Sequence, residues 1–120
     1  MQIFSKADIL NHMVQYRAER LDRVFRALSD STRRGILLQL ERGPVGVNEL
    51  ARGYDMSLTA VAKHVKVLEE AELAITKKLG RVRSVHAIPE GVSEAAAWIE
   101  RYTKFWGEAL GRFAAFVEGE

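Results

Sequence analysis

Apolar positions recur three or four residues apart along much of this chain, which is the spacing of one face of an α-helix. The first stripe consists of Ile3, Ala7, Leu10 and Val14. It predicts a helix over residues 5–17, and a second stripe predicts a short helix over residues 21–28 that ends near Ser29. Each helix has an apolar face that another part of the fold must cover.

A helix start and a helix end follow in quick succession. Asp30 has the chemistry of an N-cap, because its carboxylate can accept hydrogen bonds from the first free amides of a helix predicted over residues 31–41. Gly43 and Pro44 end that helix. Residues 45–47 are too few for an independent strand, but they can pair with the edge of a small sheet.

Two short helices separated by a tight turn occupy the middle of the chain. Residues 48–53 form the first, and Ser57 is a strong N-cap for the second, which runs to about residue 70. Asp55 lies in the turn and tolerates a left-handed backbone better than most residues. This spacing is typical of a helix-turn-helix.

The hydrophobic period then changes from helical to alternating, which predicts a β-hairpin over residues 73–88 with its turn at residues 79–81. Pro89 ends the second strand, and residues 93–116 can form one long helix. The apolar side chains of this helix are mostly aromatic: Trp98, Ile99, Tyr102, Phe105, Trp106, Leu110, Phe113 and Phe116.

The order of these elements, with helices first, a small β-hairpin wing next and a long helix last, predicts a mainly α fold of the winged helix-turn-helix class. No internal repeat and no linker rich in Pro, Gly or Ser interrupts the chain. We therefore expect a single domain over residues 1–120, with the helix-turn-helix at 48–70 and the wing at 73–88.

Three segments together resemble the ArsR family of transcriptional regulators. Residues 21–37 are similar to the family's opening segment, and residues 47–51 and 56–73 are similar to its helix-turn-helix. The resemblance covers about residues 21–88 and implies a DNA-binding protein. The partners that it implies are double-stranded operator DNA and a second copy of the chain. It also implies repression. Ala62 departs from the pattern, because this position usually carries serine in the family.

Composition narrows the class of protein further. The 120 residues are 48% hydrophobic and 28% charged, which is typical of a globular chain with one modest core. There is no cysteine, which excludes disulfides and thiolate chemistry and fits a reducing compartment. Residues 1–10 contain Lys6 and Asp8 and no continuous apolar stretch, which predicts neither a signal peptide nor a membrane helix. We expect a cytoplasmic protein.

The net charge of +2 is divided unevenly. Residues 1–56 carry nine basic and seven acidic side chains, residues 57–88 carry six and three, and residues 89–120 carry three and six. The balances are therefore +2, +3 and −3. A basic middle followed by an acidic, aromatic tail predicts one surface for a polyanion and a different surface for another contact.

In a winged helix-turn-helix the start of the second helix points into the DNA major groove, where each base pair shows a distinct set of chemical groups. The amides at this helix start can bind a phosphate, and small side chains there can touch base edges. The hairpin cations can neutralise phosphates. The candidate DNA-binding residues are Ser57, Leu58, Thr59, Lys63, His64 and Lys66 in the helix and Lys78, Arg81 and Arg83 in the hairpin.

Each of these features also has a purely structural interpretation. Ser57 caps its helix even if it also contacts DNA. Lys63 and Lys66 can simply form a face of the helix that is exposed to solvent. His64 alone is more typical of a surface or a satisfied core histidine, and hairpin cations can protect a strand edge from pairing. We expect Arg33 to pair within the chain, with Asp30 or Glu41.

The terminal helices carry more apolar surface than one domain of this size can cover, and exposed apolar area of this kind marks an interface. We expect these helices to form a homodimer contact. Two-fold symmetry would then present two reading helices to half-sites about one DNA turn apart. The candidate interface residues are Ile3, Leu10, Val14, Ile99, Tyr102, Trp106 and Phe113.

No feature points to metal binding or catalysis. Metal-sensing members of the resembled family carry cysteines where this chain has Gly46 and Asn48, and residues 89–120 contain no histidine. No nucleophile and base pair is apparent, so we expect neither an enzyme nor a cofactor. Two alternatives remain open, a winged-helix module that binds proteins and a regulator that responds to a small molecule whose identity the sequence does not reveal.

Overall fold

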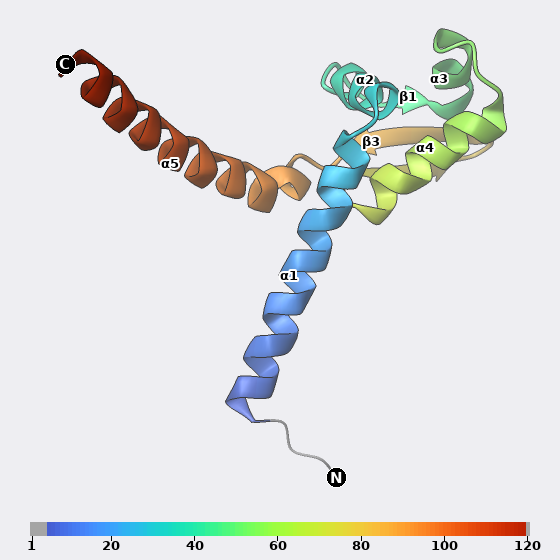
Figure 1. The fold of residues 1–120 in the computed structure, drawn as a ribbon. Coiled ribbons are helices and arrows are strands. Elements are labelled where there is room, and N and C mark those ends of the chain that lie inside the picture. The colour runs from blue at the N-terminus through green and yellow to red at the C-terminus, as the bar shows by residue number, and fades with distance from the viewer. Residues whose placement is uncertain (1–4, 120) are drawn as a thin grey trace.

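A computed structural model of the chain describes residues 5–119 and shows a winged helix-turn-helix. Four helices, with one short strand between the second and the third, precede a β-hairpin, and a long helix follows it (Figure 1). The elements are α1 (Lys6–Leu28), α2 (Ser31–Leu40), β1 (Val45–Gly46), α3 (Val47–Gly53), α4 (Leu58–Glu70), β2 (Ala74–Leu79), β3 (Val82–Ala87), the 3₁₀ turn η1 (Pro89–Val92) and α5 (Ser93–Glu118).

The sheet has three antiparallel strands in the order β1-β3-β2. Val45 in β1 lies opposite Val85 in β3, which confirms that this short segment pairs with a sheet edge. Strands β2 and β3 form the predicted hairpin, with Leu79 opposite Val82 and a two-residue turn between them. Gly80 in the turn has a φ of 65°, a conformation that glycine adopts without strain.

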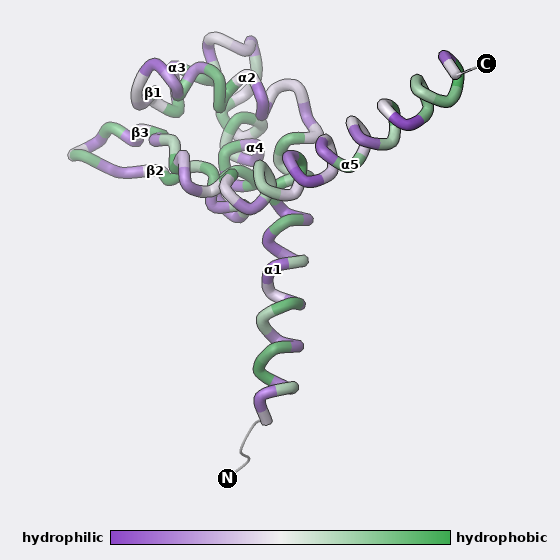
Figure 2. The backbone as a smooth tube through the Cα atoms, turned by 90° about the vertical axis from the view of Figure 1, so that its left-hand side faces the viewer, coloured by the Kyte–Doolittle hydropathy of each residue, from purple (hydrophilic) through white to green (hydrophobic). Residues whose placement is uncertain are grey.

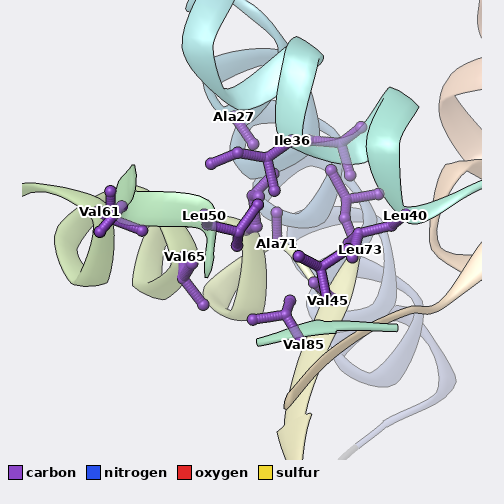
Figure 3. Close-up of a cluster of buried hydrophobic side chains, with 14 of the residues drawn as sticks. Ala27, Ile36, Leu40, Val45, Leu50, Val61, Val65, Ala71, Leu73 and Val85 are labelled. Atoms are coloured by element: carbon purple, nitrogen blue, oxygen red, sulfur yellow. The ribbon is translucent and has the colours of Figure 1, made fainter. Parts of the chain in front are cut away.

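The core lies where α2, α3 and α4 meet the sheet (Figure 3). One buried residue from each strand, Val45, Ala74 and Val85, lies in the same cluster as the buried face of α4. The largest fully buried side chains are Ile36, Leu50, Val61, Leu68, Leu73 and Val85. Helix α1 contributes only Val24 and Ala27 to the buried set.

Local chemistry defines the starts of α2 and α4 as predicted. The Oδ1 atom of Asp30 accepts hydrogen bonds from the backbone amides of Thr32 at 2.8 Å and Arg33 at 3.2 Å. The Ser57 hydroxyl accepts from the Ala60 amide at 3.1 Å. Asp55, in the turn between α3 and α4, has a left-handed φ of 51°. The side chains of Asp30 and Ser57 satisfy amides that the helices leave free.

The prediction of two separate helices before Ser29 is wrong, because α1 is continuous from Lys6 to Leu28. Residues 18–20 interrupt the apolar stripe, but Ala18, Glu19 and Arg20 all favour helix and include no glycine or proline. A break in an apolar stripe marks a change in what the helix contacts. It does not require a break in the helix, and here the helical backbone continues through residues 18–20.

The molecule is far from spherical. Its radius of gyration is 19.9 Å and its extents are 66 × 56 × 21 Å, whereas a compact domain of this length has a radius of gyration of about 14 Å. The outer parts of α1 and α5 project from the core in different directions (Figure 1). We call residues 6–19 of α1 and 96–118 of α5 the arms. Figure 2 shows hydrophobic segments, in green, along both arms.

The bases of the arms are joined to the core and to each other. Phe25 of α1 meets Trp98 of α5 edge to face, with ring centroids 5.8 Å apart. The Arg20 guanidinium lies 3.2 Å from the Glu72 carboxylate and 3.6 Å from that of Glu94. At Gly91 any Cβ would collide with the Glu72 carbonyl oxygen, so the chain can enter α5 this close to the core only with glycine.

Candidate nucleic-acid interface

The first turn of α4 is open to solvent, while one face of the rest of the helix packs in the core. Val61, Val65 and Leu68 are buried and fix the rotation of the helix about its axis. Leu58 and Thr59 consequently point away from the core, and Leu58 is 51% exposed. An exposed leucine beside an exposed threonine can contact thymine methyl groups and base edges.

Two lysines continue this surface along α4. Lys63 and Lys66 are exposed, and neither has a carboxylate within 4.0 Å among residues 5–119. Lys63 lies about one turn beyond Thr59, and Lys66 lies one turn further from the helix start. Both ammonium groups are therefore free to meet an anion that approaches α4.

His64 is placed differently from its neighbours. It is only partly exposed, and its Nδ1 atom lies 3.2 Å from the Arg33 guanidinium and 4.0 Å from the Asp30 carboxylate. Hydrogen bonds from the backbone amides of Arg33 and Thr32, together with the positive charges of Arg33 and His64, hold the pKa of Asp30 below its ordinary value. His64 thus takes part in a contact between α4 and the start of α2, which is the structural role named above as its alternative.

Arg33 pairs within the chain, as expected, but not with the expected carboxylates. Its Nε donates to the Ala27 carbonyl oxygen at 2.8 Å, and its Nη2 donates to that of Arg26 at 2.9 Å. These carbonyls belong to the last turn of α1, and that of Arg26 also accepts hydrogen bonds from the amide and the hydroxyl of Ser29. One guanidinium therefore connects α1, α2 and His64 of α4.

The hairpin presents the predicted cations. Lys78, Arg81 and Arg83 are all exposed, and Lys78 lies directly opposite Arg83 in the strand register. Like charges in such a cross-strand pair repel each other. No carboxylate within 4.0 Å compensates them in the described part of the chain. An external anion would relieve this repulsion.

A cavity of about 460 Å³ separates the hairpin from the helix-turn-helix, and it adds one residue that sequence reasoning missed. Arg52 of α3 lines this cavity together with Arg81 and Arg83. The signal was present in α3, because Leu50 and Ala51 are its buried residues and leave Arg52 on the solvent side. That the solvent side faces the hairpin is evident only from the tertiary structure.

The candidate interface residues on the arms are all exposed where the structure describes them. Leu10 and Val14 lie on the α1 arm, and Ile3 lies outside the described residues. On the α5 arm Trp98 and Tyr102 stack at 5.0 Å, and Trp106 extends this aromatic row. Sequence reasoning missed three further exposed apolar side chains of α1: Ile9, Met13 and Tyr16. The exposed set on α5 includes Ile99, Tyr102, Trp106 and Phe113.

Two kinds of feature are absent from residues 5–119. No helix there is long and apolar enough to cross a membrane. No group of three or more His, Asp or Glu side chains in that range is arranged to hold a metal ion.

Comparison with known proteins agrees with this geometry. A family of helix-turn-helix domains matches residues 28–76. The HTH-type transcriptional regulator Rv2034 of Mycobacterium tuberculosis is 37% identical over 99 residues, which is 82% of this chain and 90% of the relative. The crystal structure of the ArsR family transcriptional regulator RHA00566 is 39% identical with a TM-score of 0.69, covering 75% of this chain and 93% of its own. The chain belongs to the ArsR family.

A second ArsR-like structure, a transcriptional regulator from Rhodococcus sp. RHA1, matches 89% of this chain and 97% of its own, with 32% identity and a TM-score of 0.72. This ArsR-family chain is accordingly a transcriptional regulator with a helix-turn-helix DNA-binding domain, in which α3 and α4 are the two helices. The relatives are transcriptional regulators and not enzymes, which is consistent with the expectation that this chain is not an enzyme.

Proposed function

We propose that this ArsR-family chain is a homodimeric transcriptional repressor that binds a palindromic operator through α4 and the hairpin. The observation that carries the proposal is the exposed first turn of α4 beside uncompensated hairpin cations. The two features lie on one unit with a common buried core, so they can meet one ligand together. A duplex with a readable major groove and a charged backbone fits both.

Two groups of side chains take different roles in this proposal. Leu58, Thr59 and Lys63 read bases, because they occupy the exposed start of α4. The others hold the backbone or enter the minor groove, and this group consists of Ser57, Lys66, Lys78, Arg81 and Arg83. In His64 only Nε2 remains for DNA, since Nδ1 faces Arg33.

The arms provide the reason for the homodimer. Their apolar side chains, such as Leu10 and Tyr102, are about half exposed or more, and an exposed aromatic row on α5 has the chemistry of an interface centre. A second copy supplies an equivalent apolar face by symmetry. Two copies related by a two-fold axis carry two α4 helices, and they therefore favour a palindromic site.

Repression is the simpler regulatory outcome for such a protein, because a bound dimer blocks a promoter by occupying it. The transcriptional repressor SdpR of Bacillus subtilis supports this choice, being 31% identical over 61 residues, or 51% of this chain and 68% of that relative. An activator would also need a surface that contacts RNA polymerase.

Titration of the full chain against the DNA upstream of its own gene tests the proposal. A scrambled duplex of the same length serves as the control, and parallel titrations contain Zn²⁺ or a chelator. We expect sequence-specific binding, unchanged by Zn²⁺ or chelator, and repression of a reporter placed behind that DNA. Equal affinity for both duplexes would contradict operator recognition, and binding to neither would favour the alternative of a protein-binding module.

A further inference from the structure

The cavity between the hairpin and the helix-turn-helix, which we call the wing groove, has a definite composition. Arg52 and Glu49 of α3 line one side, and Arg81 and Arg83 of the hairpin line the other. Leu58 and Ala62 of α4 also line it. The groove is about 460 Å³ in volume and opens to solvent along exposed residues.

The wing groove is positively charged without an internal counter-ion. Three guanidinium groups line it against one carboxylate, and Glu49 is not within 4.0 Å of any of them. Within residues 5–119 the side chains of Arg52, Arg81 and Arg83 make no hydrogen bond either. A planar guanidinium with free donors is well suited to bind the oxygens of a phosphate.

The position of the groove determines which phosphate it can reach. Leu58 lies at the start of α4, which enters the major groove in the proposed complex, and Arg81 lies at the tip of the hairpin. In a complex with α4 in the major groove and the hairpin tip at the adjacent minor groove, the DNA strand that separates the two grooves passes between α4 and the hairpin. The small side chain of Ala62 leaves room on the α4 side for that strand.

We propose that the wing groove binds one phosphodiester of the DNA backbone in each protomer, and that Arg52 is its contact from the α3 side. The inference rests on the proposed binding of DNA by α4 and the hairpin, and it adds a binding residue outside both elements. A phosphate held from two sides fixes how deeply α4 enters the major groove. It carries no base information, so its contribution is the same on any sequence.

The test compares Arg52→Ala with Arg42→Ala in the full-length chain. Arg42 is an exposed arginine in the turn after α2, and it does not line the groove, so the two variants lose the same charge. Affinity for a random-sequence duplex is measured at several salt concentrations. We expect Arg52→Ala to lower the salt slope by about two units per dimer, since each phosphate contact contributes roughly 0.9, and Arg42→Ala to leave it unchanged.

Duplexes with single phosphates replaced by uncharged methylphosphonates locate the contact. For the wild-type chain, one position in each half-site should weaken binding, and for Arg52→Ala the same replacement should weaken it less, because only Arg81 and Arg83 then remain to contact that phosphate. A full additional loss in the variant, or an unchanged salt slope with DNA binding intact, overturns the wing-groove proposal alone. If the wild-type chain binds no DNA at all, the proposed function fails as well.

Discussion

The unit that reads DNA and the arms that leave it are built from equally regular amphipathic helices, yet their apolar faces have opposite surroundings. In α4 the apolar stripe is buried against α1, α2, α3 and the sheet, and Leu68 is fully covered. In α5 an apolar face of similar strength is open, and Phe113 is 66% exposed. The two helices differ because one chain supplies enough neighbouring elements to cover the apolar face of α4 but not that of α5.

This contrast separates two kinds of stability. The core of α2, α3, α4 and the sheet is satisfied by contacts within one chain, so it should not need a partner subunit to fold. The arms become covered only by association, so the order of their side chains should increase with concentration. Variants of the core, the arms and the DNA-reading surface test this division.

The largest effect is expected in the core. Leu68→Ala removes a fully buried side chain between α4 and its neighbours, which should lower the free energy of unfolding by about 2–5 kcal/mol. Urea unfolding followed by circular dichroism measures the loss, and Leu110→Ala on the exposed face of α5 is the matched control. Equal losses for both variants would show that the arm is as well packed as the core.

The next effect concerns association. The wild-type chain should sediment at micromolar concentration with twice its chain mass of 13.5 kDa. Trp106→Ala should weaken the dimer by about 2 kcal/mol or more, roughly thirty-fold, because large aromatic side chains dominate interfaces. Arg112→Ala, a charged neighbour on the same helix, should have little effect. A wild-type chain that sediments as a monomer would contradict the interface and the palindromic site together.

A smaller effect should distinguish base reading from backbone holding within the DNA-reading unit. Thr59→Ala should cost about 1–3 kcal/mol of affinity for the operator and little for random DNA. Arg81→Ala should instead weaken both duplexes alike and lower the salt slope. Lys63→Ala should lower both the affinity for the operator and the salt slope, because Lys63 is charged and lies close to the base edges in the proposed complex. If Arg81→Ala changes neither affinity nor slope, the hairpin cations serve only to protect a strand edge.

The smallest effect is expected where α1 meets α2. Bonded amides and nearby positive charge lower the pKa of Asp30, so its ionised form stabilises the folded state. The contribution is complete above the pKa of the unfolded carboxyl group and disappears as the pH falls through the lower pKa of the folded state. Asp30→Asn, which still caps α2 but cannot ionise, should be less stable than wild type at neutral pH. The difference should vanish in acid, and a difference that persists would exclude ionisation as its cause.

Features that depend on neighbouring residues were predictable from the sequence. The caps at Asp30 and Ser57 and the left-handed turn at Asp55 follow from side-chain chemistry within three residues, and the structure has each of them. The exposed apolar arms were predictable for a different reason, since a chain of 120 residues cannot cover so much apolar surface.

The remaining features required the tertiary structure. The partners of Arg33 are carbonyl oxygens six and seven residues earlier, and they come within reach only when the chain turns between α1 and α2. Arg52 joins the candidate site only because the hairpin folds back beside α3. The hydrophobic pattern contains neither fact, because it indicates which residues are buried and not how helices and strands are oriented relative to one another.

The contact made by Arg33 has a mechanical consequence. With 23 residues, α1 is about 35 Å long, and its last turn is joined through this guanidinium to α4. A tilt of one degree about that contact moves the far end of α1 by about 0.6 Å over this length. In the proposed dimer the far end touches the partner, so small adjustments between subunits become changes in the separation of the two α4 helices. The geometry of the Arg33 contact therefore limits how much variation in half-site spacing the dimer can tolerate.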